Sequence, residues 1–122
     1  MANILVIEDE PQIRDNLSRF LNLEGHQVTC AADGLAGLES ARRTAPHLII
    51  CDFMMPRVNG FQVLAALQAD PGLKNVPVIM ISASAEPERL AQATALGACA
   101  YVTKPFQLAQ LRALLDRHLA AA

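Results

Sequence analysis

Charge of one sign is what this 122-residue sequence most clearly lacks. Its ten basic and twelve acidic residues are spread along the chain and leave a formal net charge of -2. Because no basic run is available to neutralise a row of nucleic-acid phosphates, we expect no direct nucleic-acid binding. Charged residues make up only 18% of the chain and hydrophobic residues 52%, which excludes a disordered chain. We predict one folded domain spanning residues 1–122.

Long apolar runs and a leader sequence are also missing. No stretch approaches the roughly 18 consecutive apolar residues that a membrane-spanning helix needs. The first residues, Met1 to Asn3, have neither the basic flank nor the cleavage site of a secretory signal. We therefore expect a cytoplasmic protein without membrane attachment.

Cysteine is scarce, and its spacing excludes two kinds of site. Cys30, Cys51 and Cys99 are odd in number and form no Cys-x-x-Cys pair, so neither a disulfide framework nor a zinc site is indicated. We expect each cysteine to be a small buried hydrophobic residue. The three histidines also lack metal-ligand spacing and are assigned structural or surface roles.

What the sequence does contain is a regular alternation of two patterns. Short apolar runs occur at residues 4–7, 28–31, 48–51, 76–81 and 100–102, and segments of helical periodicity lie at 13–24, 35–41, 61–67, 87–96 and 108–119. The runs are continuously apolar, which is typical of parallel strands covered by helices on both faces. Five strand–helix units with short right-handed connections predict a doubly wound (βα)5 sandwich of three layers around a parallel five-stranded sheet.

Polar residues follow four of these five strands. Glu8 and Asp9 follow the first, Asp52 the third, Ser82 the fourth and Lys104 comes just after the fifth. Each could be a helix cap or a surface group if taken alone. Ligands bind at the carboxyl ends of the strands in doubly wound sheets, so we interpret the set as one site.

The carboxylates of this site predict a divalent cation. Two carboxylates about 4 Å apart repel by roughly 4 kcal/mol at an effective dielectric of 20, so the cluster needs a cation or a raised pKa. Mg²⁺ prefers hard oxygen ligands, keeps several waters and binds phosphate oxygens, which suits phosphoryl transfer. Lys104 would add a second positive charge.

Four motifs occur in a fixed order along the chain: Glu8-Asp9, Asp52-Phe53-Met54-Met55-Pro56 with Gly60 following, Ser82-Ala83, and Tyr101-Val102-Thr103-Lys104-Pro105-Phe106. In the order and spacing of these motifs, the whole chain resembles the receiver domain of bacterial two-component response regulators. The resemblance implies a CheY-like, flavodoxin-like sheet of order 2-1-3-4-5 in a response regulatory domain.

The resemblance also implies a role for each residue. Asp52 would accept a phosphoryl group from a sensor histidine kinase or a phosphotransfer protein, forming an aspartyl phosphate. Asp9, Asp52 and the Met54 backbone carbonyl would bind Mg²⁺, with Glu8 acting through a coordinated water. Lys104 would pair with Asp52 and then with a phosphoryl oxygen, through a cis peptide bond to the following proline. Catalysis would be limited to the protein's own phosphorylation and dephosphorylation.

Ser82 and Tyr101 would form the switch. The Ser82 hydroxyl would bind the phosphoryl group, and Tyr101 would relay the change to the face formed by the helix 87–96, the strand 100–103 and the helix 108–119, where an effector protein would bind. The segment before Tyr101 lacks acidic residues for dimer salt bridges, so we expect a monomer or weak dimer. Met54 and Ser84 would overhang the site, and Met54 cannot position an attacking water by hydrogen bonds, which predicts a long-lived phosphoryl group.

Three alternatives differ in class. A degenerate receiver would act only as an interaction module. A flavodoxin-like FMN binder would need a phosphate loop after the first strand, where Glu8, Asp9 and Glu10 would repel a phosphate that has no metal. A hydrolase of the haloacid dehalogenase type would carry Asp-x-Asp after that strand, and this spacing is absent.

Overall fold

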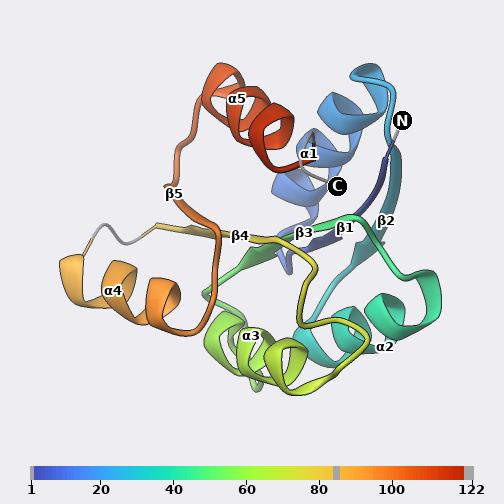
Figure 1. The fold of residues 1–122 in the computed structure, drawn as a ribbon. Helices are drawn as coiled ribbons and strands as arrows, with labels where there is room; N and C mark the ends of the chain where they lie inside the picture. Colours follow the sequence, from blue (N-terminus) through green and yellow to red (C-terminus); the bar gives the residue numbers. More distant parts are fainter. Residues whose placement is uncertain (1, 84–85, 120–122) are drawn as a thin grey trace.

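Strands and helices alternate five times along the chain (Figure 1). The structure is a computed structural model that describes residues 2–83 and 86–119. The elements in chain order are β1 (Asn3–Ile7), α1 (Pro11–Leu23), β2 (Gln27–Ala31), α2 (Gly34–Thr44), β3 (Leu48–Asp52), α3 (Gly60–Ala69), β4 (Val78–Ser82), α4 (Pro87–Ala95), β5 (Ala100–Thr103) and α5 (Leu108–Leu119).

The five strands form one parallel sheet in the order β2-β1-β3-β4-β5, which confirms the predicted topology. The chain starts in the middle of the sheet, moves outward to β2, and then returns past β1 to β3. The direction of winding therefore reverses between β1 and β3, which is where doubly wound sheets bind ligands.

Helices cover both faces of the sheet. Figure 1 shows α1 and α5 on one face and α2, α3 and α4 on the other. Each face has its own apolar core. One core contains Leu17, Phe20 and Leu21 of α1 with Leu111 of α5, and the other is centred on α2 and α3. No helix in residues 2–83 and 86–119 is long and apolar enough to span a bilayer.

The central and edge strands differ in burial. All residues of β3 and β4 are buried, whereas β2 and β5, at the two edges of the sheet, are only partly buried. The expectation that every cysteine is buried is wrong for this reason. Cys51 on β3 is buried, but Cys30 lies on the edge strand β2 and is exposed, and Cys99 is intermediate.

Local signals fix several helix starts. Pro11 begins α1, Asp33 caps α2 by accepting a hydrogen bond from the Ala36 backbone N–H, and Asn59 forms a capping box with Gln62 at the start of α3. The predicted fourth strand began too early, because β4 starts only at Val78, after Pro77.

Candidate functional site

The polar residues predicted to lie at one edge of the sheet do lie there. Glu8 and Asp9 follow β1, Asp52 and Ser82 are the last residues of β3 and β4, and Lys104 follows β5. In a parallel sheet these positions share the carboxyl edge, and β1 and β3 are neighbours at its centre. The strand register therefore brings Glu8, Asp9 and Asp52 together across the point where the winding reverses.

The three carboxylates form a tight cluster. One oxygen from each of Glu8, Asp9 and Asp52 lies within 4.8 Å of the other two. Glu8 is 0% exposed and Asp52 is 1% exposed, so water solvates these two carboxylates poorly. Asp9 Oδ1 and Asp52 Oδ2 are buried and accept no hydrogen bond within the part of the chain that the structure describes. Buried oxygens of this kind are costly unless a cation or proton compensates them.

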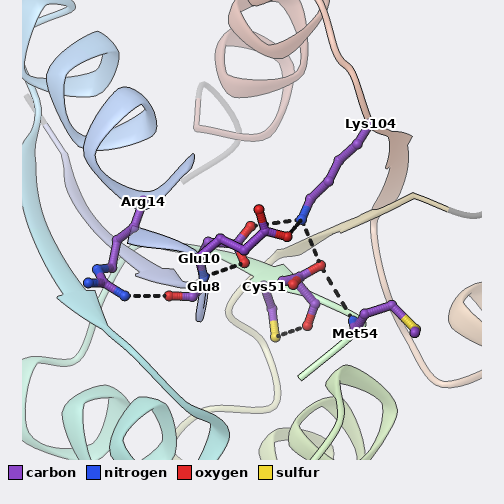
Figure 2. Close-up of polar contacts among 7 residues, drawn as sticks. Glu8, Glu10, Arg14, Cys51, Met54 and Lys104 are labelled. Atoms are coloured by element: carbon purple, nitrogen blue, oxygen red, sulfur yellow. Dashed lines mark hydrogen bonds and ion pairs between the residues drawn. The ribbon is translucent and has the colours of Figure 1, made fainter. Parts of the chain in front are cut away.

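Lys104 supplies the cation that faces this cluster (Figure 2). Its Nζ lies 2.9 Å from Glu8 Oε1, 3.3 Å from Asp52 Oδ1 and 4.0 Å from Glu10 Oε1. The Lys104 backbone N–H donates to the Ser82 carbonyl at 2.7 Å, which ties the start of this segment to the end of β4. The peptide bond from Lys104 to Pro105 is cis, as predicted.

Burial dominates the ionisation of the site. Burial, followed by a hydrogen bond with Asp52, raises the pKa of Glu8 to about 8, although Lys104 opposes the rise. Burial also raises the pKa of Asp52, against the effects of Glu8 and Lys104. Burial alone would lower the pKa of Lys104, but the hydrogen bond with Glu8 and the charge of Asp52 outweigh it and raise that pKa. The cluster therefore favours retaining one proton on Glu8 beside a charged lysine.

The loop after β3 is fixed by backbone contacts close to Asp52. The Met54 backbone N–H lies 3.4 Å from Asp52 Oδ1, and the Phe53 carbonyl accepts hydrogen bonds from the Met55 and Gly60 N–H groups. A Cβ on Gly60 would come within 2.7 Å of the Asp52 carbonyl oxygen and the Phe53 Cα. Only glycine therefore lets α3 start so close to the Asp52–Phe53 peptide.

Two neighbouring residues were not assigned to the site from sequence. Arg14 Nη1 donates to the Glu8 carbonyl at 2.9 Å, and the Glu10 N–H lies 3.3 Å from Glu8 Oε2 (Figure 2). Both contacts hold the short connection between β1 and α1. One sequence signal could have suggested the contact between Arg14 and the Glu8 carbonyl. Arg14 lies in the first turn of its helix, where a long side chain points back toward the loop that precedes the helix.

The two predicted switch residues lie in different surroundings. Ser82 is fully buried at the carboxyl end of β4. Tyr101 on β5 is half-buried and packs against the core on the α2 and α3 face. Their roles remain predictions, and Ser84, expected to overhang the site, is outside the described residues.

The donor set fits a hard divalent cation. Among residues 2–83 and 86–119, buried carboxylate oxygens without hydrogen-bond partners converge from the ends of β1 and β3, and the Lys104 ammonium offsets only part of their charge. Thiol and imidazole ligands are not part of the cluster, which favours Mg²⁺ over zinc or copper.

Comparison with known proteins gives consistent similarities. The family model described as the response regulator receiver domain matches residues 4–116. The chain is 40% identical over 121 residues to the DNA-binding dual master transcriptional regulator RpaA of Synechocystis, a match that covers 96% of this chain and 50% of RpaA. It is also 40% identical to the transcriptional regulatory protein KdpE of Mycobacterium tuberculosis, over 100% of this chain and 54% of KdpE. The chain thus spans about half the length of the curated relatives that it matches.

Solved structures are similar over nearly the whole chain. The chemotaxis protein CheY4 of Vibrio cholerae has a TM-score of 0.92 and 33% identity, with 98% of this chain and 99% of that chain covered. The receiver domain of the sensor histidine kinase PA1611 of Pseudomonas aeruginosa has a TM-score of 0.90 and 28% identity, with 98% of each chain covered. That structure has a magnesium ion coordinated in its active-site cleft.

Proposed function

The chain belongs to the receiver domain family of response regulators, and from this we propose that Asp52 is its phosphoacceptor in a two-component phosphorelay. The observation that carries the proposal is the buried contact among Asp52, Glu8 and Lys104. An acidic cluster with an inward-facing lysine at the carboxyl edge of the sheet suits the transfer of an anionic group.

The proposed reaction transfers one phosphoryl group. An Asp52 carboxylate oxygen attacks the phosphorus of a phosphohistidine on a sensor histidine kinase or phosphotransfer protein. The new P–O bond forms as the P–N bond breaks, and the electron pair of that bond remains on the imidazole. Lys104, 3.3 Å from Asp52 Oδ1, would stabilise the negative charge on the phosphoryl oxygens.

Mg²⁺ would be held by Asp9, Asp52 and the Met54 backbone carbonyl, with Glu8 acting through a coordinated water. When bound, the ion supplies positive charge to the phosphoryl oxygens and the carboxylates. The convergence of buried oxygens from Glu8, Asp9 and Asp52 supports this assignment. The residues themselves align the acceptor oxygen and keep Lys104 directed at it.

The chain is proposed to act as a switch rather than as an enzyme with a separate substrate. It would catalyse only its own phosphorylation and dephosphorylation, in the cytoplasm. Ser82 would bind the phosphoryl group and Tyr101 would relay the change to the face formed by α4, β5 and α5, where an effector protein or output segment docks. RpaA is a DNA-binding regulator twice as long as the matched region, so nucleic-acid binding, if the whole protein has it, is assigned to a part other than this domain.

Phosphorylation by acetyl phosphate tests the proposal. Intact mass spectrometry should detect one added phosphoryl group on the wild type with Mg²⁺, little without Mg²⁺, and none on Asp52→Asn. Asp15→Asn, an exposed change on α1, is the matched control and should be phosphorylated like the wild type. Failure of the wild type to gain mass with Mg²⁺ would leave the degenerate receiver as the better account. A yellow purified protein would favour the flavin-binding alternative.

A further inference from the structure

Helix α4 is held only lightly by the apolar core. Ala93 is the one buried side chain among residues 87–95, and Leu90 is 45% exposed. A helix with so little buried apolar surface belongs to the low-stability part of a fold. Each side-chain contact between α4 and the rest of the molecule therefore contributes a large share of what holds α4 in position.

Arg89 makes such a contact. It is half-buried although its neighbours Glu88 and Leu90 are exposed. The guanidinium carbon lies 4.2 Å from the centroid of the Phe53 ring, well within the range of a cation–π interaction. We call this contact the Arg89–Phe53 stack.

The Phe53 side of the stack is firmly fixed. The ring is buried and packs against Phe61 with centroids 4.5 Å apart. The Phe53 N–H donates to the Ile81 carbonyl at 2.8 Å, and its carbonyl accepts from the Gly60 N–H at 2.9 Å. The aromatic ring is thus a rigid platform, and the arginine on α4 is the partner that is free to leave it.

The stack lies next to the acceptor residue in the chain. Phe53 directly follows Asp52, and Arg89 shares a cavity of about 520 Å³ with Phe53, Met54 and Asn59. The Met54 backbone N–H lies 3.4 Å from Asp52 Oδ1, so a residue that lines this cavity also contacts the acceptor carboxylate. Arginine binds phosphoryl oxygens through two parallel hydrogen bonds, a stronger contact than a partly exposed cation–π interaction.

We propose that the Arg89–Phe53 stack fastens α4 to the loop after the phosphoacceptor, and that phosphorylation releases the Arg89 guanidinium from the Phe53 ring toward the phosphoryl group. The release step rests on the proposed function of Asp52. The phosphoryl group carries about -1.5 to -2 charge in place of the single carboxylate charge of Asp52, and this greater negative charge attracts the guanidinium away from the ring. The unphosphorylated and phosphorylated proteins then differ in the Arg89–Phe53 stack. A difference in contacts of this kind is required for phosphorylation to shift the populations of two conformations.

Hydrogen exchange of α4 measured by mass spectrometry tests both parts. In the unphosphorylated protein, Arg89→Gln should speed amide exchange in 87–95 about two- to fivefold, since the lost contact opens the helix more often. Arg117→Gln, an exposed arginine-to-glutamine change on α5, is the matched control and should leave α4 exchange unchanged. Acetyl phosphate with Mg²⁺ should slow α4 exchange in the wild type, because Arg89 exchanges its ring contact for a stronger contact with the phosphoryl oxygens, and it should not slow α4 exchange in Arg89→Gln.

A double-mutant comparison isolates the pair. Phe53→Leu keeps apolar bulk but removes the π face, so Arg89→Gln should have no added effect on α4 exchange in that background. Unchanged α4 exchange in unphosphorylated Arg89→Gln, or a full additional effect in the Phe53→Leu background, would overturn the stack. If the wild type gains no phosphoryl mass, the release step fails together with the proposed function. The unphosphorylated comparison would still decide whether the stack fastens α4.

Discussion

Asp52 occupies a position that serves chemistry at the expense of stability. It lies 3.3 Å from Lys104, but it also shares a water-poor cluster with the carboxylates of Glu8 and Asp9. With all three carboxylates ionised, the charges of Asp9, Asp52, Glu8 and Lys104 sum to -2. Burial raises the pKa of Glu8 to about 8 because this excess has little solvent to screen it. The metal-free protein therefore carries unfavourable electrostatic energy at its own functional site.

Neutralising Asp52 should make the metal-free protein more stable. Asp52→Asn removes one negative charge while Lys104 remains paired with Glu8 at 2.9 Å. We expect the free energy of unfolding at pH 7.5 in EDTA to rise by about 1–2 kcal/mol, the worth of about one pKa unit of relieved repulsion. Urea unfolding followed by circular dichroism measures it, because the chain has no tryptophan. Asp15→Asn should stay within about 0.5 kcal/mol of the wild type, and a destabilised Asp52→Asn would refute the argument.

At the scale of the elements, the positions of all five strands were predictable, whereas the exposure of side chains on the edge strands was not. β3 and β4 are buried on both faces, so their sequences are continuously apolar and their ends are marked by Asp52 and Ser82. β2 and β5 border solvent on one side, and their partial burial leaves a weaker pattern. Cys30 shows the consequence, since an apolar residue type in an edge strand is exposed.

The site was predictable to the extent that strand ends determine it. Glu8, Asp52 and Lys104 come together because strand order and register place three chain positions at one edge. Arg89 on Phe53 could not be predicted in this way, because the contact depends on how far α4 lies from the sheet and on the rotamer of a long side chain. No periodicity in the sequence encodes those two quantities.

The start of α3 is an element boundary with a strict steric requirement. A Cβ on Gly60 would meet two backbone atoms at 2.7 Å, the Asp52 carbonyl oxygen and the Phe53 Cα. Backbone atoms cannot move away as a side chain can, so Gly60→Ala should destabilise the fold by about 1–3 kcal/mol. It should also slow phosphorylation by acetyl phosphate, because the peptide that carries Asp52 is displaced. Gly72→Ala is the matched control, since its Cβ would meet only the Asp70 side chain at 3.4 Å. Equal stability of the two variants would contradict this reading.

At the scale of the whole molecule, the raised pKa values of the buried carboxyl groups make stability depend on pH and on metal together. The pKa of Glu8 is raised to about 8 by burial, and that of Asp52 is raised in the same direction. A raised carboxyl pKa means that the folded state binds a proton more tightly than the unfolded state. This contribution to stability is complete below pH 4.5, the ordinary pKa of Glu8, and is lost as pH rises to about 8. Lys104 has a raised pKa above this window and stays charged throughout it.

Mg²⁺ should reverse this loss, because it replaces the proton as the partner of the carboxylates. In EDTA, the free energy of unfolding should fall as pH rises from 5 to 8. At pH 8, Mg²⁺ at 100 times its dissociation constant should raise the free energy of unfolding by about 2.7 kcal/mol. The gain should shrink toward pH 5, where protons compete for the same oxygens. Urea titrations at each pH, in EDTA and in Mg²⁺, measure the difference in the free energy of unfolding. In the Glu8→Gln variant, the free energy of unfolding in EDTA should decrease less between pH 5 and pH 8 than it does in the wild type. A magnesium effect that is equal at pH 5 and pH 8, or a Glu8→Gln variant with the wild-type slope, would show that the metal and the shared proton do not occupy the same cluster.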